Sequence, residues 1–232
     1  MIFFQGKRRD EEWGSVMGNT HLAPKVKATY EAVIALFMEG ADLNNLTVAE
    51  ITAKAGIGKG TAYEYFSNKE EMIAGALFYE LKESCESLYE HLKKEKDLYG
   101  KMNAILLSME KKLTQTSCFF QAVHVMTDNS AISSKLKEMV DSKTENDLLL
   151  VDVLRKVVEE EMGCEDELSE EDKAYLVMAV LSRLICYAMY QLDISSGIKP
   201  ERKAMREMIC KSSCLEIESF KTEKRAGWEF VI

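Results

Sequence analysis

The chain has 232 residues, of which 30% are charged and 47% are apolar. This length fits two helical units better than one small bundle. The formal net charge of −9 argues against a protein that binds DNA through bulk positive charge, but a sequence-specific reader needs only local basic groups. Leu, Met, Glu, Lys and Ala are abundant and prolines number two, so we expect an all-α protein.

The segment before the first predicted helix is polar and irregular. Residues 1–20 show no helical period, and the basic run at residues 7–9 is followed at once by acids at residues 10–12. We therefore expect residues 1–20 to form a flexible N-terminal arm. A minor-groove role for the basic run stays open as an alternative.

The first helix is predicted from Pro24 to about Gly40, because apolar residues recur at a spacing of three to four through this stretch. Lys25 and Lys27 stand in its first turn, where the helix dipole favours acids over cations. We interpret these two lysines as contacts to DNA phosphates.

Residues 47–73 read TVAEITAKAGIGKGTAYEYFSNKEEMI and predict two short helices joined by a tight turn. Thr47, with an acid three residues later, forms a capping box for the first helix. Gly56 supplies the positive φ that the turn needs. The second helix, roughly residues 59–66, is too short to be stable alone and is expected to dock through Ala62 and Phe66, which are four residues apart.

The remaining faces of that second helix carry small, hydroxylic and cationic side chains, a pattern typical of the recognition helix in a helix-turn-helix. Gly60 lets the backbone approach DNA closely, and the Thr61 hydroxyl suits a phosphate or a thymine methyl group. Lys59, Tyr63 and Lys69 supply further phosphate donors.

The run AGIGKGTAYEYFSNKEEM closely resembles the DNA-binding signature of TetR-family (tetracycline-repressor-like) transcriptional regulators, and the resemblance covers about residues 24–73. It implies a three-helix DNA-binding domain at residues 21–70. It also implies that a set of residues lies at DNA, namely Thr47, Lys59, Gly60, Thr61, Tyr63 and Lys69. By the same resemblance, Tyr65 and Phe66 hold the recognition helix against its neighbours.

Two residues depart from the family pattern. Gly58 stands where the family often has a capping serine, and Glu64 places an acid near the DNA backbone, which should weaken non-specific affinity. Five lysines and five acids also balance within residues 21–69. We therefore expect DNA binding to depend on geometry and dimerisation.

Residues 71–215 are predicted to form a second, C-terminal helical domain for ligand binding and dimerisation. A long helix from Asn68 to about Lys94 is expected to link the two domains. Further helices are predicted at residues 98–114, 119–127, 131–162, 170–195 and 200–215. Residues 216–232 form a C-terminal tail, whose apolar end leaves docking on the body open.

The helix at residues 170–195 is apolar almost all round from Ala174 to Leu192. Such a helix is buried on all faces or lies in a membrane. Because Arg183 stands at its centre, we favour burial against its own domain and a second subunit. The preceding stripe at residues 148–158 would complete a four-helix dimer interface. The resemblance implies the same dimer, with recognition helices on a palindromic operator.

The resemblance also implies a small-molecule pocket in the second domain. Residues with aromatic bulk, polar tips or flexible sulfur are the predicted lining: Phe119, Phe120, His124, Met126, Tyr187 and Tyr190. Four methionines are candidates for an adaptable wall: Met102, Met109, Met178 and Met189. Core packing is the competing interpretation for every one of these residues.

The sequence carries no catalytic motif of the HExxH, GxSxG, P-loop or dinucleotide type, and its three histidines are scattered. We expect no enzyme activity, no cofactor and no metal. Cys210 and Cys214 are four residues apart, so a thiol sensor or metal pair is an alternative to buried, inert thiols. The cysteine usage fits a reduced, cytoplasmic protein.

These observations predict a ligand-responsive transcriptional regulator that binds a palindromic double-stranded DNA operator as a homodimer. We expect a repressor that an unknown small molecule releases from the operator, with no membrane partner. The alternative is a helical protein-interaction adaptor whose helix-turn-helix no longer binds DNA.

Overall fold

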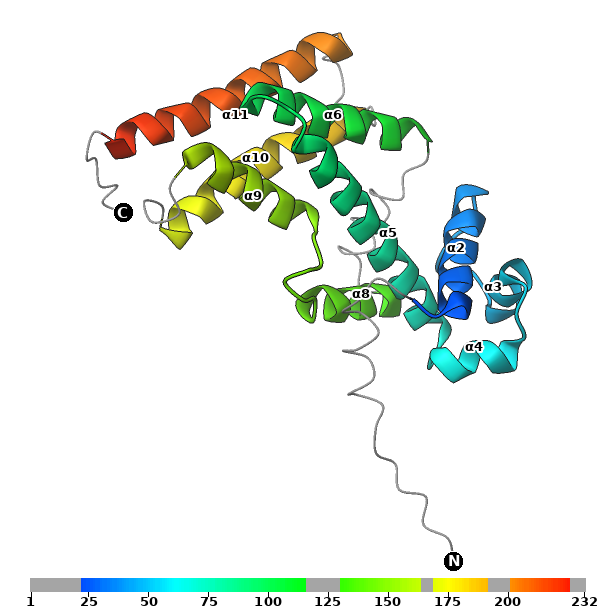
Figure 1. Ribbon diagram of the computed structural model, residues 1–232. Coiled ribbons are helices and arrows are strands. Elements are labelled where there is room, and N and C mark those ends of the chain that lie inside the picture. The colour runs from blue at the N-terminus through cyan, green and yellow to red at the C-terminus, as the bar shows by residue number, and fades with distance from the viewer. Residues whose placement is uncertain (1–21, 116–129, 164–168, 192–200, 226–232) are drawn as a thin grey trace, which may run out of the picture. The chain divides into compact units, whose positions relative to one another are not determined.

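The computed structural model describes residues 22–115, 130–163, 169–191 and 201–225. Within these ranges every regular element is an α-helix (Figure 1). The helices are α2 (Pro24–Met38), α3 (Val48–Ala55), α4 (Lys59–Tyr65), α5 (Lys69–Leu92), α6 (Leu98–Gln115), α8 (Ala131–Asp141), α9 (Leu150–Met162), α10 (Glu170–Gln191) and α11 (Arg202–Arg225). The predicted all-α class is confirmed. The N-terminal arm and the helix predicted at 119–127 lie outside the described residues.

The chain divides into two compact units. The first unit comprises Met1–Lys82 and Cys118–Asp147, and the second comprises Glu83–Ser117 and Leu148–Ile232. Helix α5 begins in the first unit and ends in the second, so a single helix runs through this boundary (Figure 1).

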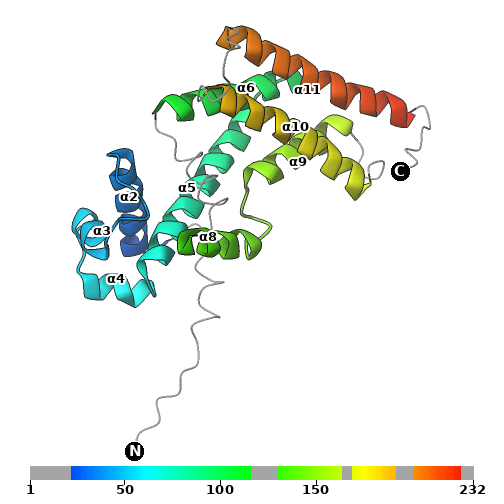
Figure 2. The ribbon, with the colours of Figure 1, turned by 180° about the vertical axis from the view of Figure 1, so that it is seen from behind.

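In the first unit, α2, α3 and α4 pack on one another around a small apolar core (Figures 1 and 2). Val33, Ile51 and Ala62, one from each helix, are fully buried. The local signals that define these helices are as predicted. Thr47 accepts a hydrogen bond from the amide of Glu50 while the Glu50 carboxylate accepts one from the amide of Thr47, which is the expected capping box.

The close approach of α5 to α2 requires a glycine. A Cβ atom at Gly75 would stand 2.8 Å from Cζ of Tyr30, a buried tyrosine of α2. Burial raises the pKa of the Tyr30 hydroxyl, and the charge of Glu71 adds to the rise. The Tyr30 ring also contacts Phe66 and Tyr79, with centroids 5.8 and 5.9 Å away. Tyr30 therefore joins α2, the end of α4 and α5.

The prediction of one continuous helix at residues 131–162 is wrong, because the structure has two helices there, α8 and α9. The break contains a turn in which Oδ2 of Asp147 accepts hydrogen bonds from the amide and hydroxyl of Thr144, at 2.9 and 2.7 Å. The Asp152 carboxylate then accepts a bond from the Leu149 amide and starts α9. Turn-forming residues thus outcompete the helical period here.

The turn before α9 is also tied to α5. Nζ of Lys82 lies 2.6 Å from Oδ1 of Asp147, whose side chain is 1% exposed. Lys82 and Asp147 are the last residues of the two segments that make up the first unit. The ion pair therefore links the C-terminal ends of the two chain segments that form the first unit.

The second unit packs α9, α10 and α11 with α6 around a continuous apolar core. Its most buried members include Ile105, Leu154, Leu176, Tyr187 and Ile217. Helix α11 runs to Arg225 rather than ending near residue 215, which corrects the predicted C-terminal boundary of this helix. Ile217 and Phe220 continue its buried stripe past the predicted end.

Helix α10 has one buried and one exposed face. Its exposed apolar side chains follow helical spacing, at Tyr175, Met178, Ile185 and Met189. Among the described residues α10 is the one helix long and apolar enough to cross a membrane, and a third of its apolar stretch is buried. A single such helix is weak evidence for a membrane span, because the core helix of a water-soluble protein passes the same test.

Candidate nucleic-acid interface

The turn between α3 and α4 is built by two glycines. Gly56 has φ of 68°, the left-handed conformation that was predicted for it. Gly58 precedes α4 in an extended conformation and offers no side-chain cap, as its departure from the family pattern suggested. Ala62 and Phe66 are the buried residues of this segment, so the opposite side of α4 faces outward.

The outward side of α4 carries the side chains predicted to meet DNA. Lys59, Gly60, Tyr63 and Glu64 are exposed, and Thr61 is half-buried. A Cβ atom built at Gly60 meets no atom within 4 Å, so this position opens onto free space. The sequence places these residues on one short helix, and the structure gives them a shared exposed surface.

Tyr65 differs from its expected role. Its side chain is 39% exposed, whereas Phe66 is 3% exposed and its ring packs at a tilt against that of Tyr30. Phe66 therefore anchors the end of α4, and Tyr65 does not share that task. Tyr65 is the last residue of α4 and Phe66 is its C-cap in an extended conformation, so the two side chains leave the chain in different directions and Phe66 is the one that faces the core.

The lysines of the first unit differ in what their ammonium groups contact. Lys27 lies 3.9 Å from Glu31, and Lys54 pairs with Glu39. Lys69 donates to the backbone carbonyls of Asn44 and Leu46, at 2.8 and 3.0 Å. Its ammonium therefore fastens the loop before α3 to the start of α5, a contact that the sequence did not suggest.

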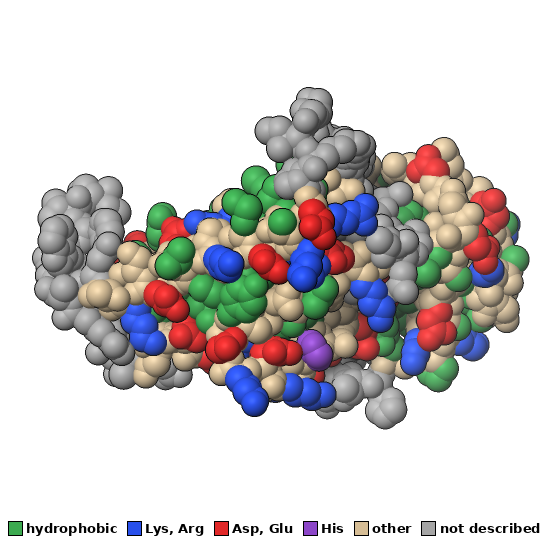
Figure 3. Space-filling view, turned by 90° about the horizontal axis from the view of Figure 1, so that it is seen from above, with side chains coloured by type: hydrophobic (Ala, Val, Ile, Leu, Met, Phe, Trp, Pro, Cys, Tyr) green, Lys and Arg blue, Asp and Glu red, His purple; other side chains and the backbone are tan. Residues whose placement is uncertain are grey.

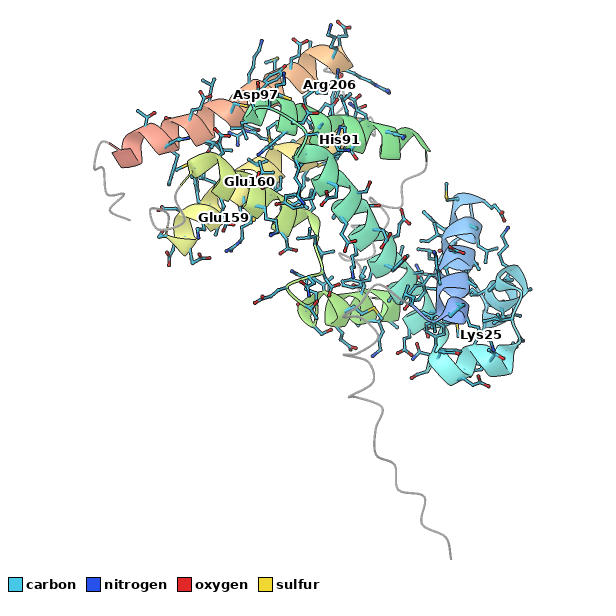
Figure 4. The ribbon with its side chains drawn as sticks, viewed as in Figure 1. Lys25, His91, Asp97, Glu159, Glu160 and Arg206 are labelled. Atoms are coloured by element: carbon cyan, nitrogen blue, oxygen red, sulfur yellow. The ribbon has the colours of Figure 1, made fainter. Side chains whose placement is uncertain are left out.

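Two predicted phosphate donors remain uncommitted. Among the lysines at described positions 22–69, Lys25 and Lys59 are the two whose ammonium groups have no ion-pair or hydrogen-bond partner. Lys25 lies at the N-terminal end of α2 (Figure 4). Thr47 is exposed, but its hydroxyl already donates to the Glu50 carboxylate at 2.6 Å. The side chains of Lys25 and Lys59 are thus free to donate to DNA, whereas the Thr47 hydroxyl already donates within the protein.

The second unit contains a partly buried polar cluster at the junction of α6, α10 and α11. Tyr187, which is fully buried, donates to the carboxylate of Glu110. Arg206 of α11, labelled in Figure 4, donates to the same carboxylate at 2.7 Å and to the amide oxygen of Asn103 at 3.1 Å. Burial raises the pKa of the Tyr187 hydroxyl, and its bond to Glu110 raises it further. The cluster joins one buried phenol to a cation and an anion that are each partly exposed.

The predicted ligand residues fall into two groups. Phe119, Phe120, His124 and Met126 lie outside the described residues. Tyr187 and Tyr190 are described, and their rings stack with centroids 6.3 Å apart. The methionines predicted to form an adaptable wall are also separated, because Met102 is buried in the core while Met178 and Met189 are exposed on α10. The four methionines therefore do not line one common surface.

The thiols of Cys210 and Cys214 are not poised for reaction. Burial raises the pKa of both Cys210 and Cys214 to about 11, so both stay protonated near neutral pH. Within the described residues, no group of three or more His, Cys, Asp or Glu side chains is placed to hold a metal ion. The inert-thiol interpretation therefore fits these two cysteines better than a sensor.

An open hollow of about 610 Å³ lies where α6 begins, beside α9 and α11. Lys96, Tyr99, Lys211 and Glu218 are among its lining residues, whereas Tyr187 and Tyr190, the two predicted ligand residues that the structure describes, do not line it. It carries charges of both signs, and acidic, basic and apolar side chains also interleave on the face seen from above (Figure 3). It gives no single charge preference for a ligand.

One family model matches part of the first unit. Residues 32–76 match the family model of bacterial regulatory proteins, tetR family. The match spans the end of α2, the helix-turn-helix and the start of α5. The comparison with curated proteins gives no match.

Solved structures share the fold over most of the chain. The fatty acid degradation regulator FadR from Bacillus halodurans is 16% identical, with a TM-score of 0.59, and covers 84% of this chain and 96% of its own. FadR from Bacillus subtilis, solved with stearoyl-CoA, is 14% identical, with a TM-score of 0.58 and coverage of 81% and 96%. A tetR-family regulator from Streptomyces coelicolor is 13% identical, with a TM-score of 0.59 and coverage of 89% and 90%. At these identities the likeness shows the fold alone.

Proposed function

We propose that this chain, which belongs to the TetR family of bacterial regulatory proteins through residues 32–76, represses transcription by binding a palindromic operator as a cytoplasmic homodimer. The observation that carries the proposal is the outward surface of α4, where Lys59, Gly60 and Tyr63 are exposed together while Ala62 and Phe66 anchor the helix. An exposed, firmly docked short helix is what major-groove entry requires.

Dimerisation is supported by the outer surface of the second unit. Tyr175, Met178, Ile185 and Met189 form an exposed apolar stripe along α10, and α11 adds exposed apolar side chains of its own. An apolar stripe of this length is typical of a face that a second subunit covers. A twofold dimer sets its two recognition helices about one DNA turn, roughly 34–36 Å, apart, so the operator is a palindrome.

The composition of the proposed interface differs from the sequence-based prediction. Leu154, Val157 and Val158 of α9 were expected to face the second subunit, but each is buried in its own unit, and of the predicted stripe in α9 Val151 alone is exposed. Helix α11 takes that place, because it packs beside α10 and leaves Met208 and Leu215 exposed. The four-helix interface we propose therefore pairs α10 and α11 of one protomer with the same helices of its partner.

The pair α10 and α11 is also joined by polar contacts next to this surface. The Glu216 carboxylate accepts hydrogen bonds from Tyr175 and from Arg183, whose guanidinium also donates to the Ala179 carbonyl. Arg183 interrupts the apolar run of α10, and its carboxylate partner on α11 satisfies its charge within the protomer. The two helices thus meet a partner as one preformed surface.

Release from the operator requires an effector that binds the DNA-incompetent form more tightly than the DNA-competent form, because only that difference shifts the equilibrium. The partly buried cluster of Tyr187, Glu110 and Arg206 supplies polar groups that such a ligand can engage in the second unit. Stearoyl-CoA, the ligand in the Bacillus subtilis FadR structure, is the first effector to test. Its control is stearate, which lacks the nucleotide portion.

The function is tested by electrophoretic shift with the DNA upstream of the protein's own gene, at low and moderate salt. Lys59→Ala and Tyr63→Ala should each weaken binding about tenfold, as expected for loss of one DNA contact per protomer. Lys94→Ala, which removes an exposed lysine from outside the helix-turn-helix, should change it little. Unchanged binding by both α4 variants would rule out α4 as the DNA-reading element.

An adaptor that no longer binds DNA is the second candidate. Glu64 on the outward side of α4 and the balance of five lysines and five acids in residues 21–69 favour it. The same assay separates the two, because an adaptor gives no shift of any duplex at low salt.

A further inference from the structure

Glu64 occupies the centre of the outward side of α4. It is two residues from Ala62, the buried residue of α4, and helical residues two apart point about 200° apart. Tyr63 and Tyr65, one residue to either side of Glu64, point closer to the direction of Ala62, so Glu64 points away from the core more directly than its neighbours. In a docked complex the position that enters the groove most directly therefore carries a carboxylate.

Nothing in the described protein neutralises this carboxylate. The positions three and four residues away on either side hold Gly60, Thr61, Ser67 and Asn68, so no cation lies one helical turn from it. Among the described residues, no side chain forms an ion pair with Glu64. An unpaired carboxylate brought against DNA phosphates is repelled, unless the base edges supply a donor.

A carboxylate accepts hydrogen bonds and donates none, so only donors on the base edges can pair with it. In the major groove these are the amino groups of cytosine and adenine. Adenine presents its N7 acceptor beside the amino group, which repels a second carboxylate oxygen, whereas cytosine presents the amino donor alone. The carboxylate at this position therefore selects cytosine over adenine, guanine and thymine.

Gly60 provides the approach that this contact needs. It lies one turn before Glu64 on the same side of α4, and a Cβ atom there would meet free space rather than protein. The absence of a side chain at residue 60 lets the backbone of α4 lie close to the groove floor. The two-methylene side chain of Glu64 then spans the remaining distance to a base edge.

We propose that Glu64 reads a cytosine amino group in the major groove and so determines the operator sequence at one position of each half-site. This inference rests on the proposed function, because it needs α4 to enter DNA. It assigns Glu64 a specificity role, where the sequence alone suggested only a loss of non-specific affinity.

The test is selection of binding sites from a random duplex library, with sequencing of the sites bound by the full-length protein. Wild type should enrich a palindrome with a C·G pair at one position of each half-site, preferred on the order of tenfold over other pairs. Glu64→Gln should shift that position towards adenine, because an amide pairs with its amino group and N7. Glu64→Ala should lose preference there and keep it elsewhere, and its affinity for unselected DNA should rise.

Glu83→Gln is the matched control, since it makes the same charge change at an exposed site on α5 outside the helix-turn-helix. It should return the wild-type site. Thermal melting should be alike for all four proteins, because the Glu64 side chain is exposed and unpaired. An identical base preference for wild type and Glu64→Ala would overturn the inference while leaving the function intact. Failure of the wild type to enrich any duplex would overturn the proposed function itself, and the inference with it.

Discussion

Replacing Lys82 by methionine should cost more stability than replacing Asp147 by asparagine, because the two partners of this ion pair differ in burial. The Asp147 side chain is 1% exposed and that of Lys82 is 23% exposed. Lys82→Met leaves a buried carboxylate without its cation, at a cost of about 3–5 kcal/mol. Asp147→Asn frees an ammonium that reaches water and keeps an oxygen for Thr144, so it should cost about 1–2 kcal/mol.

Urea unfolding of the full chain, followed by circular dichroism, measures both losses. The control is Lys135→Met, which breaks an exposed pair with Glu138 and should cost less than about 1 kcal/mol. The double variant at Lys82 and Asp147 should lose less than the sum of the single losses, because each single change removes the same interaction. Equal losses for the two single variants, or strictly additive ones, would refute the assignment of a buried pair.

The same pair sets a pH dependence. Burial alone would raise the pKa of Asp147, but the hydrogen bonds from Lys82 and Thr144 and the charge of Lys82 outweigh it and hold that pKa below its usual value. The folded pKa lies below the unfolded one, so the stabilisation is present above about pH 4 and is lost as the pH falls through the folded pKa. In Lys82→Met the buried carboxylate should titrate at a higher pH, which reverses the sign of this dependence.

Three further outcomes follow from the geometry. Gly60→Ala should raise the free energy of unfolding by about 0.5 kcal/mol through helix propensity, yet weaken DNA binding about tenfold in a gel shift, because the added methyl group fills only free space in the protein. Gly75→Ala should lower stability in urea by about 1–3 kcal/mol, because its methyl group overlaps the Tyr30 ring. Met178→Glu combined with Ile185→Glu should raise the dimer dissociation constant on the order of 100-fold in sedimentation while leaving the helical content unchanged.

The first unit could be predicted from sequence because its signals are local. The capping box at Thr47, the positive φ of Gly56 and the buried Ala62 each depend on residues within one helical turn, and the structure has all three. Lys69 marks the limit of such reasoning. Its ammonium contacts carbonyls 25 and 23 residues earlier, which no local pattern reveals.

The second unit was predicted less well because long-range partners decide its details. The break between α8 and α9 depends on a turn at Asp147 that Lys82 of α5 helps to fix. The bonds from Arg206 and Tyr187 to Glu110 join residues 96 and 77 positions apart. The extension of α11 could have been predicted from the sequence, since Ile217 and Phe220 continue the helical spacing of its buried side. The many charged residues of α11 concealed that pattern.

The salt dependence of binding to the selected operator tests the central claim most directly. Lys25 and Lys59 have uncommitted ammonium groups, and Lys27 has only a weak, exposed pair with Glu31 at 3.9 Å. These three lysines are therefore available to phosphates in each protomer, whereas Lys69 is bound to carbonyls. Six contacts per dimer predict a slope of log K against log salt of about −5, and Lys59→Ala should reduce its magnitude by about 2. A salt slope of about this size, with a magnitude that Lys59→Ala reduces by about 2, supports a dimeric protein that contacts DNA through α4. A slope that Lys59→Ala leaves unchanged, or no binding at low salt, would contradict it.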